Sequence, residues 1–336
     1  MGLLTSAFFL WLTFRGEDLG EIWCQFMSGD PYWLMLAGAI ATSGGLIRAL
    51  RWRLLLSPLK VETSLHSRWA ALNIGFMVTN VYPGRLGEIV RPLALSRMAP
   101  VTMSGALGTV VLERVLDTVA LVLLLLISLL APTFPSDATV LGRPIGIAVI
   151  AAVVLAVTIL VLMVCIIVWP SRLTVVAVGL ARRLPGHLDD GLAEKLESFV
   201  SGLQLLRRPA AMVQAMAWSL LLWVWMAGSF WAGFRAFGIE LGAMAALFTQ
   251  CAVSVFVAIP AAPGFLGTMQ AGIAVSVHEV FGVAAGPTLS LAIGYHLAGF
   301  IPVTLLGLYY ASRLGLRVGA VESEAESALE RETESD

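Results

Sequence analysis

Residues 146–169 read GIAVIAAVVLAVTILVLMVCIIVW, a run of 24 positions without a charged side chain. Because a helix that crosses the apolar core of a bilayer needs ~20 mostly apolar residues, this run predicts a transmembrane helix. The whole chain of 336 residues has the same character, with 58% hydrophobic and 13% charged residues, whereas soluble proteins average about 45–50% and ~25%. A water-soluble globule is therefore excluded, and we expect an all-α integral membrane protein.

Five other apolar stretches bring the predicted number of spanning helices to six. The first, Gly2–Phe14, is short for a span, but it has neither the basic start nor the small-residue cleavage site of a signal peptide. We therefore interpret it as the first helix, and whether its start is complete is left open. The other four stretches are Tyr32–Ala49, Ser104–Leu130, Ala210–Phe234 and Leu289–Ser312.

Lys and Arg residues concentrate in alternate loops. Short loops rich in these residues lie on the cytoplasmic side of a membrane. The distribution therefore predicts that both termini are cytoplasmic. Fourteen basic residues fall in segments 48–68, 170–208 and 313–331, against three in segments 15–30, 131–143 and 232–243.

Two further apolar segments, about 66–98 and 241–281, are each interrupted near the middle by a Pro-Gly pair. The pairs are Pro83-Gly84 and Pro263-Gly264. Proline removes a backbone donor and clashes with the preceding turn, so each helix must stop there. If the loops rich in Lys and Arg are all to lie on the cytoplasmic side, each segment must enter and leave the membrane on the same side. Each is therefore predicted to form a re-entrant helical hairpin. Broken backbone at membrane depth is tolerated where it is buried in protein or lines a cavity.

The two interruptions resemble each other. Residues 83–88 read PGRLGE and residues 263–268 read PGFLGT, which share the pattern PGxLG. The order of elements in 1–130 recurs in 144–312 with opposite orientation, which predicts an inverted 3+3 repeat. Secondary transporters have such repeats and bind substrate at the interrupted segments. Chance recurrence in a chain with 32 glycines is the alternative.

Six charged residues follow the first interruption or lie inside the third span, where each needs a partner or a water-filled cavity. Two interpretations remain open. In one, a neutral network pins the hairpin to the span, with Arg91 against Glu113 or Asp117. In the other, the residues line a pocket in which an anionic lipid head group replaces some of these pairs. The set contains Arg85, Glu88, Arg91, Glu113, Arg114 and Asp117.

The second hairpin has no charge at its interruption and offers Thr268 and Gln270 instead. We expect a half-helix that starts at Gly264 and directs free N–H groups toward an anion. His296 follows Pro263 at nearly the spacing at which Asp117 follows Pro83. It is interpreted either as a hydrogen-bonded interior residue or as a proton carrier.

The polytopic membrane domain is predicted to cover residues 1–312, with a cytoplasmic amphipathic connector at about 171–208. Seven acidic residues accompany a single arginine after position 321, so residues 313–336 are predicted to form an acidic, disordered cytoplasmic tail.

These motifs, in this order, resemble the flippase-like membrane domain of lysylphosphatidylglycerol synthases and its stand-alone bacterial relatives, over about residues 1–312. The resemblance implies a lipid-translocating domain in a bacterial plasma membrane, without the soluble domain that transfers the amino acid. Gln270 stands where relatives often have Glu. The motifs are Arg48-x-x-Arg51-Trp52-x-x-Leu55-Leu56, Pro83-Gly84-x-x-Gly87-Glu88-x-x-Arg91, Glu113-Arg114-x-x-Asp117 and Pro260-x-x-Pro263-Gly264-Phe265-Leu266-Gly267-Thr268.

The function predicted from the sequence is a flippase-like transporter for a phospholipid or another lipid with an anionic or zwitterionic head group. We expect no catalytic residues, no metal site, no cofactor and no nucleic-acid partner. An intramembrane lipid-modifying transferase is the first alternative, because Glu88 or Asp117 could serve as a general base. The second is a membrane partner of a glycosyltransferase or lipid synthase. A homodimer is also left open.

Overall fold

The computed structural model describes residues 2–82, 86–135 and 208–315, with isolated positions between 139 and 205. Among the described residues the regular elements are helices, apart from the two-residue strands β1 (Thr139–Val140) and β2 (Arg143–Pro144), which pair antiparallel. Pro83, Gly84 and Arg85 lie outside the described residues. So do most of the predicted span 146–169, most of the connector 171–208, and the tail from residue 316.

Four of the predicted spans are long helices, which confirms an α-helical membrane protein. Within the part of the chain that the structure describes, three segments are long and apolar enough to cross a bilayer, namely Pro31–Leu59, Pro209–Ala236 and Ala285–Leu314. α6 (Met103–Leu129) is as long as these segments, but charged residues interrupt its apolar sequence. The shorter apolar helices are α1 (Gly2–Phe14) and α11 (Ala243–Ala258). The long helices are α3 (Pro31–Leu56), α6 (Met103–Leu129), α10 (Pro209–Ala236) and α13 (Ala285–Leu314).

Capping residues explain where several of these helices begin. The Asp30 side chain accepts a hydrogen bond from the Tyr32 amide, and Thr102 caps α6 in the same way. Asp18 caps α2 (Leu19–Met27), a short helix in the segment 15–30, for which the sequence predicts a loop. α2 exposes Leu19, Trp23 and Met27, as expected for a helix that lies at a membrane interface.

The first interrupted segment forms a pair of packed helices, α4 (Leu65–Val81) and α5 (Gly87–Ser96). The two helices are in closest contact where Gly87 of α5 meets Gly75 of α4. A Cβ atom on Gly87 would overlap the carbonyl oxygen of Gly75 in α4. The chain therefore folds back on itself after α4, and the absence of a side chain at Gly87 allows the two backbones to meet.

The second interrupted segment is built in the same way but with a different second helix. α11 is followed by the 3₁₀ turn η3 (Pro263–Phe265), the short α12 (Thr268–Ile273) and the π-helical η4 (Ala274–Val280). Gly272 in α12 packs on Val253 in α11, where a Cβ on Gly272 would lie 2.9 Å from the Val253 Cα.

The prediction of a half-helix that starts at Gly264 is wrong. Gly264, Phe265 and Gly267 all have positive φ angles, of 68°, 60° and 89°. A right-handed helix cannot run through these residues, so α12 begins only at Thr268 and contains six residues. An anion site at the N-terminus of a longer helix is therefore absent from this break.

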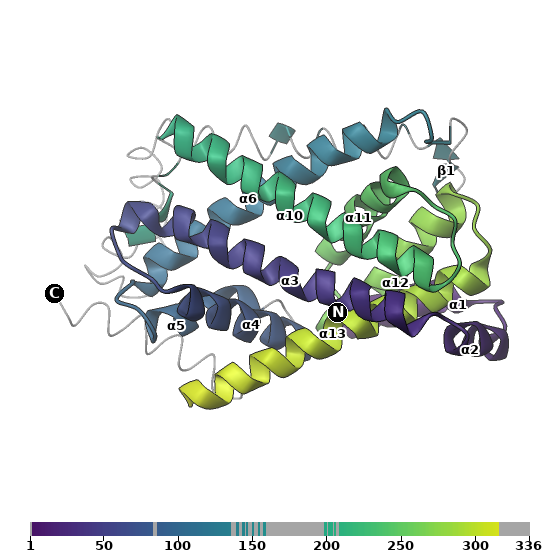
Figure 1. Ribbon diagram of the computed structural model, residues 1–336, viewed down its shortest axis with the longest axis horizontal. Coiled ribbons are helices and arrows are strands. Elements are labelled where there is room, and N and C mark those ends of the chain that lie inside the picture. The colour runs from purple at the N-terminus through teal and green to yellow at the C-terminus, as the bar shows by residue number, and fades with distance from the viewer. Residues whose placement is uncertain are drawn as a thin grey trace, which may run out of the picture.

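The long helices α3 and α10 run side by side through the centre, with α13 crossing α3 and α4 (Figure 1). α6 packs against α5, α10 and α11. The end of α4 reaches η3, where the Asn80 carbonyl oxygen is 3.3 Å from a Cβ placed on Gly264. The end of α4, which precedes the first break, thus lies next to the second break. α5, which follows the first break, contributes to a group of buried charges together with α3 and α6.

Candidate functional site

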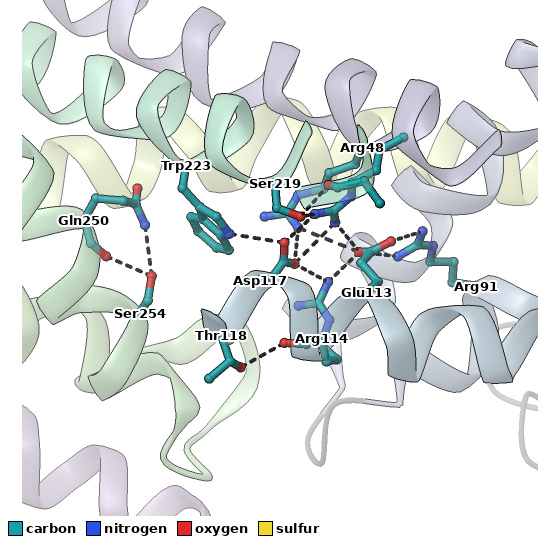
Figure 2. A network of polar contacts seen from close by, with 12 residues as sticks. Arg48, Arg91, Glu113, Arg114, Asp117, Thr118, Ser219, Trp223, Gln250 and Ser254 are labelled. Carbon is teal, nitrogen blue, oxygen red and sulfur yellow. Dashed lines mark hydrogen bonds and ion pairs between the residues drawn. The ribbon is translucent and has the colours of Figure 1, made fainter. Parts of the chain in front are cut away.

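Six charged side chains meet where α3, α5, α6 and α10 come together (Figure 2). Both carboxylates come from α6, and the arginines come from α3, α5 and α6. Five of the six are buried. We call this group the ionic cluster, and it consists of Arg48, Arg51, Arg91, Glu113, Arg114 and Asp117.

Arg91 and Glu113 form a bidentate ion pair. Both terminal nitrogens of Arg91 donate to the Glu113 carboxylate, at 2.9 and 2.7 Å. The guanidinium carbon lies 3.8 Å from the centre of the Trp52 ring, and the Trp52 indole nitrogen donates to the Thr109 hydroxyl at 2.9 Å. This pair joins α5 to α6, and of the two acids that the sequence offered as partners of Arg91 it selects Glu113. The packed indole holds the guanidinium plane in place.

Arg51 and Asp117 form the second pair. The Arg51 Nη1 donates to Asp117 at 2.5 Å and to the Ser219 hydroxyl at 2.6 Å. Its Nη2 lies 3.2 Å from Glu113, so Arg51 links the two carboxylates. The Trp223 indole also donates to Asp117, at 3.2 Å. α3, α6 and α10 are therefore tied together inside the apolar part of the molecule.

The last two arginines complete the group at opposite sides. Arg48 contacts Asp117 at 3.4 Å and Glu113 at 3.8 Å. Arg114 contacts Glu113 at 2.6 Å and Asp117 at 3.4 Å. The Arg114 side chain is 38% exposed, whereas the other five side chains are at most 10% exposed. Arg114 is consequently the member that an incoming molecule can reach first.

The ionic cluster carries more positive than negative charge. Four guanidinium groups face two carboxylates, and half-buried Glu88 adds a third negative charge near Arg114. Among the described residues, the Nε atoms of Arg51, Arg91 and Arg114 are buried without a hydrogen-bond partner. Buried charge and unpaired donors are costly, so an additional anion would stabilise this site.

The structure brings together Arg91, Glu113, Arg114 and Asp117 of the predicted set. It corrects the predicted balance of three positive and three negative charges, because two more arginines take part. Arg48 and Arg51 were assigned to a cytoplasmic loop, but α3 continues to Leu56 and buries both. Their i, i+3 spacing just before Trp52 places them on one helical face, which is the signal that could have identified them.

The predicted residues of the second hairpin form a separate hydrogen-bonded group. The Gln270 Oε1 accepts from the Gly267 amide at 2.8 Å, and its Nε2 lies 2.8 Å from the Nδ1 of His296 in α13. Thr268 donates to the Phe265 carbonyl. His296 is also hydrogen-bonded to the Gly264 backbone. These contacts hold the break in shape, and they favour the interpretation of His296 as an interior hydrogen-bonded residue.

A large groove lies on the opposite side of α3. It has a volume of about 750 Å³, and its walls come from one stripe of α3, from Trp69 and from α13. Leu46 lines it, whereas Arg48 is two residues further on and so points about 200° away around the helix. The groove is almost entirely apolar and does not open into the ionic cluster.

Fold and site together define a helical membrane protein with an arginine-rich polar centre inside its apolar body. The chain belongs to the family described as the lysylphosphatidylglycerol synthase TM region, whose model matches residues 1–307. It is also similar to a UPF0104 membrane protein of Methanothermobacter thermautotrophicus, with 23% identity over 299 residues, or 86% of this chain and 87% of the relative. No solved structure matches the chain. The family resemblance seen in the sequence motifs is thus confirmed, and a membrane role related to lipids follows from it.

Proposed function

We propose that the protein is a flippase-like lipid transporter and that the ionic cluster binds the phosphate of a lipid head group. The observation that carries this proposal is the excess of four arginines, three of them buried, over the two carboxylates that they contact. Three of their Nε atoms have no hydrogen-bond partner among the described residues. Arginine suits phosphate because its planar guanidinium offers two parallel donors. The acyl or prenyl chains would stay in the bilayer while the head group occupies the protein.

Exchange of partners would let the head group enter. Arg114 would turn from Glu113 and Asp117 toward the phosphate, because it is the most exposed member of the ionic cluster. Glu113 would keep Arg91 and Arg51, and Asp117 would keep Arg51 and Arg48. No carboxylate is left unpaired in this step, which keeps its electrostatic cost low.

We further propose six spans, two re-entrant hairpins and an inverted repeat. The neighbour relations of the two halves support the repeat. α4 packs on α5 as α11 packs on α12, and α5 contacts α6 as α12 contacts α13. Likewise α13 lies on α4 and α6 lies on α11, while the matching helices α3 and α10 meet at the centre. Adjacent breaks that open to opposite faces would give alternating access.

The same proposal places both termini in the cytoplasm and the protein in a plasma membrane. In a variant without native cysteines, Glu17→Cys is then expected to react with an impermeant maleimide in intact cells. Lys60→Cys is expected to react only after the membrane is opened. The reverse pattern would contradict the orientation.

The transport proposal is tested by Arg114→Gln. In liposomes that contain purified protein, we expect this variant to move head-group-labelled phosphatidylglycerol about tenfold more slowly than the wild type, because a charge-assisted hydrogen bond to phosphate is lost. The fold should survive, since Glu113 keeps contacts with three arginines and Asp117 with two. Arg313→Gln is the matched control, because Arg313 is an exposed arginine at the end of α13. Equal rates for all three proteins would refute the role of the ionic cluster.

A further inference from the structure

A second polar group lies beside the ionic cluster on α11. Gln250 is only 5% exposed, and its Nε2 donates to the Ser254 hydroxyl at 3.0 Å. Its Oε1 is buried and has no hydrogen-bond partner among the described residues. Because nearly all buried polar groups in proteins are hydrogen-bonded, a bare amide oxygen needs an explanation.

The orientation of this amide is fixed by its neighbour. The Ser254 hydroxyl donates its single proton to the backbone carbonyl oxygen of Gln250 at 2.8 Å. The Ser254 oxygen can therefore only accept from the side chain of Gln250, so the amide nitrogen must face it. The amide oxygen is left as the free atom, and the site needs a hydrogen-bond donor.

The position of Gln250 connects it to the ionic cluster through Trp223. The Trp223 indole donates to Asp117 on one side and packs with Leu247 and Cys251 of α11 in one buried apolar cluster. Gln250 and Ser254 continue the same stripe of α11, at spacings of three and four residues. In Figure 2 the Trp223 ring lies between Asp117 and Gln250.

We infer that Gln250 is a specificity residue that accepts a hydrogen bond from the head group of the transported lipid. This inference rests on the proposed function. The phosphate would lie in the ionic cluster, and the group beyond the phosphate would reach past Trp223 to the amide oxygen. The substrate class is then narrower than any anionic lipid, because its head group must carry a hydroxyl or ammonium donor beyond the phosphate.

Two lipids of equal charge test this inference. Phosphatidylglycerol carries hydroxyl donors beyond its phosphate, whereas phosphatidylmethanol has the same charge and no such donor. In liposomes, wild-type protein should move phosphatidylglycerol about fivefold faster than phosphatidylmethanol, as expected for one neutral hydrogen bond. Gln250→Leu should remove this preference by slowing phosphatidylglycerol alone, and Gln250→Glu, which keeps acceptor oxygens, should retain it.

If Gln250 only stabilised the fold, the same experiment would give a different result. Gln250→Leu would then lower the thermal unfolding midpoint and slow both lipids equally, which would overturn the inference. We expect its midpoint to match the wild type, because leucine leaves no unpaired amide oxygen. If wild-type protein moves both lipids without preference, the inference fails while the transport proposal stands. If it moves neither, the transport proposal itself fails.

Discussion

Glu113→Gln should cost about 3–5 kcal/mol of folding stability, the loss expected when one partner of a buried ionic group is removed. Glu113 is fully buried and contacts Arg48, Arg51, Arg91 and Arg114. Glutamine keeps the size of the side chain but not its charge, so Arg48, Arg51 and Arg114 would share Asp117. Arg91 would lose the carboxylate that it contacts. We expect little folded protein in detergent and a much lower thermal unfolding midpoint.

A matched control separates this effect from a general sensitivity to the substitution. Glu240→Gln makes the same chemical change at an exposed position before α11 and should leave the midpoint unchanged. Combining Glu113→Gln with Arg91→Gln removes one of the unpaired cations and should recover part of the lost stability. A Glu113→Gln protein as stable as the wild type would show that the ionic cluster does not hold the helices together.

Gly87→Ala is the second change with a large expected effect. The new methyl group would overlap the Gly75 carbonyl oxygen, which belongs to the α4 backbone and cannot rotate away. α4 and α5 would have to move apart, and overpacking of this kind costs about 3 kcal/mol. Since Arg91 lies on α5, its two hydrogen bonds to the Glu113 carboxylate would also lengthen. We expect a reduced yield of monodisperse protein and a lower unfolding midpoint.

Gly228→Ala provides the comparison for Gly87→Ala. Gly228 is also a helical glycine, in α10, but no atom lies within 4 Å of the position that a Cβ would take. Alanine favours helix over glycine by about 1 kcal/mol, so this variant should be at least as stable as the wild type. If the two variants behave alike, the close contact between α4 and α5 is not required.

Much of the fold could be predicted because apolar length and proline are strong local signals. The ends of α6 and α10 lie within two residues of the predicted spans. α3 was predicted to end at Ala49, because arginine usually marks the end of a span. It continues for seven more residues since Arg48 and Arg51 find carboxylates inside the protein, which hydropathy cannot reveal.

The candidate site was predictable only in part for the same reason. An ion pair of Arg91 with either Glu113 or Asp117 could be foreseen, since a buried arginine in one apolar segment needs an acid in another. The role of the Gln250 amide could not be foreseen, because the sequence does not show whether the amide oxygen of a glutamine in an apolar helix has a hydrogen-bond partner. The backbone of the second break was also missed, since the positive φ of Phe265 has no signature in the sequence.

The central claim is that this chain carries lipid head groups across a bilayer, and the wild-type liposome assay tests it most directly. Vesicles with labelled lipids in both leaflets are exposed to a membrane-impermeant quencher, with and without the purified protein. The account predicts that the protein makes the inner-leaflet pool of phosphatidylglycerol accessible, well above the level in protein-free vesicles. If no anionic or zwitterionic lipid crosses faster than in protein-free vesicles, the account is contradicted.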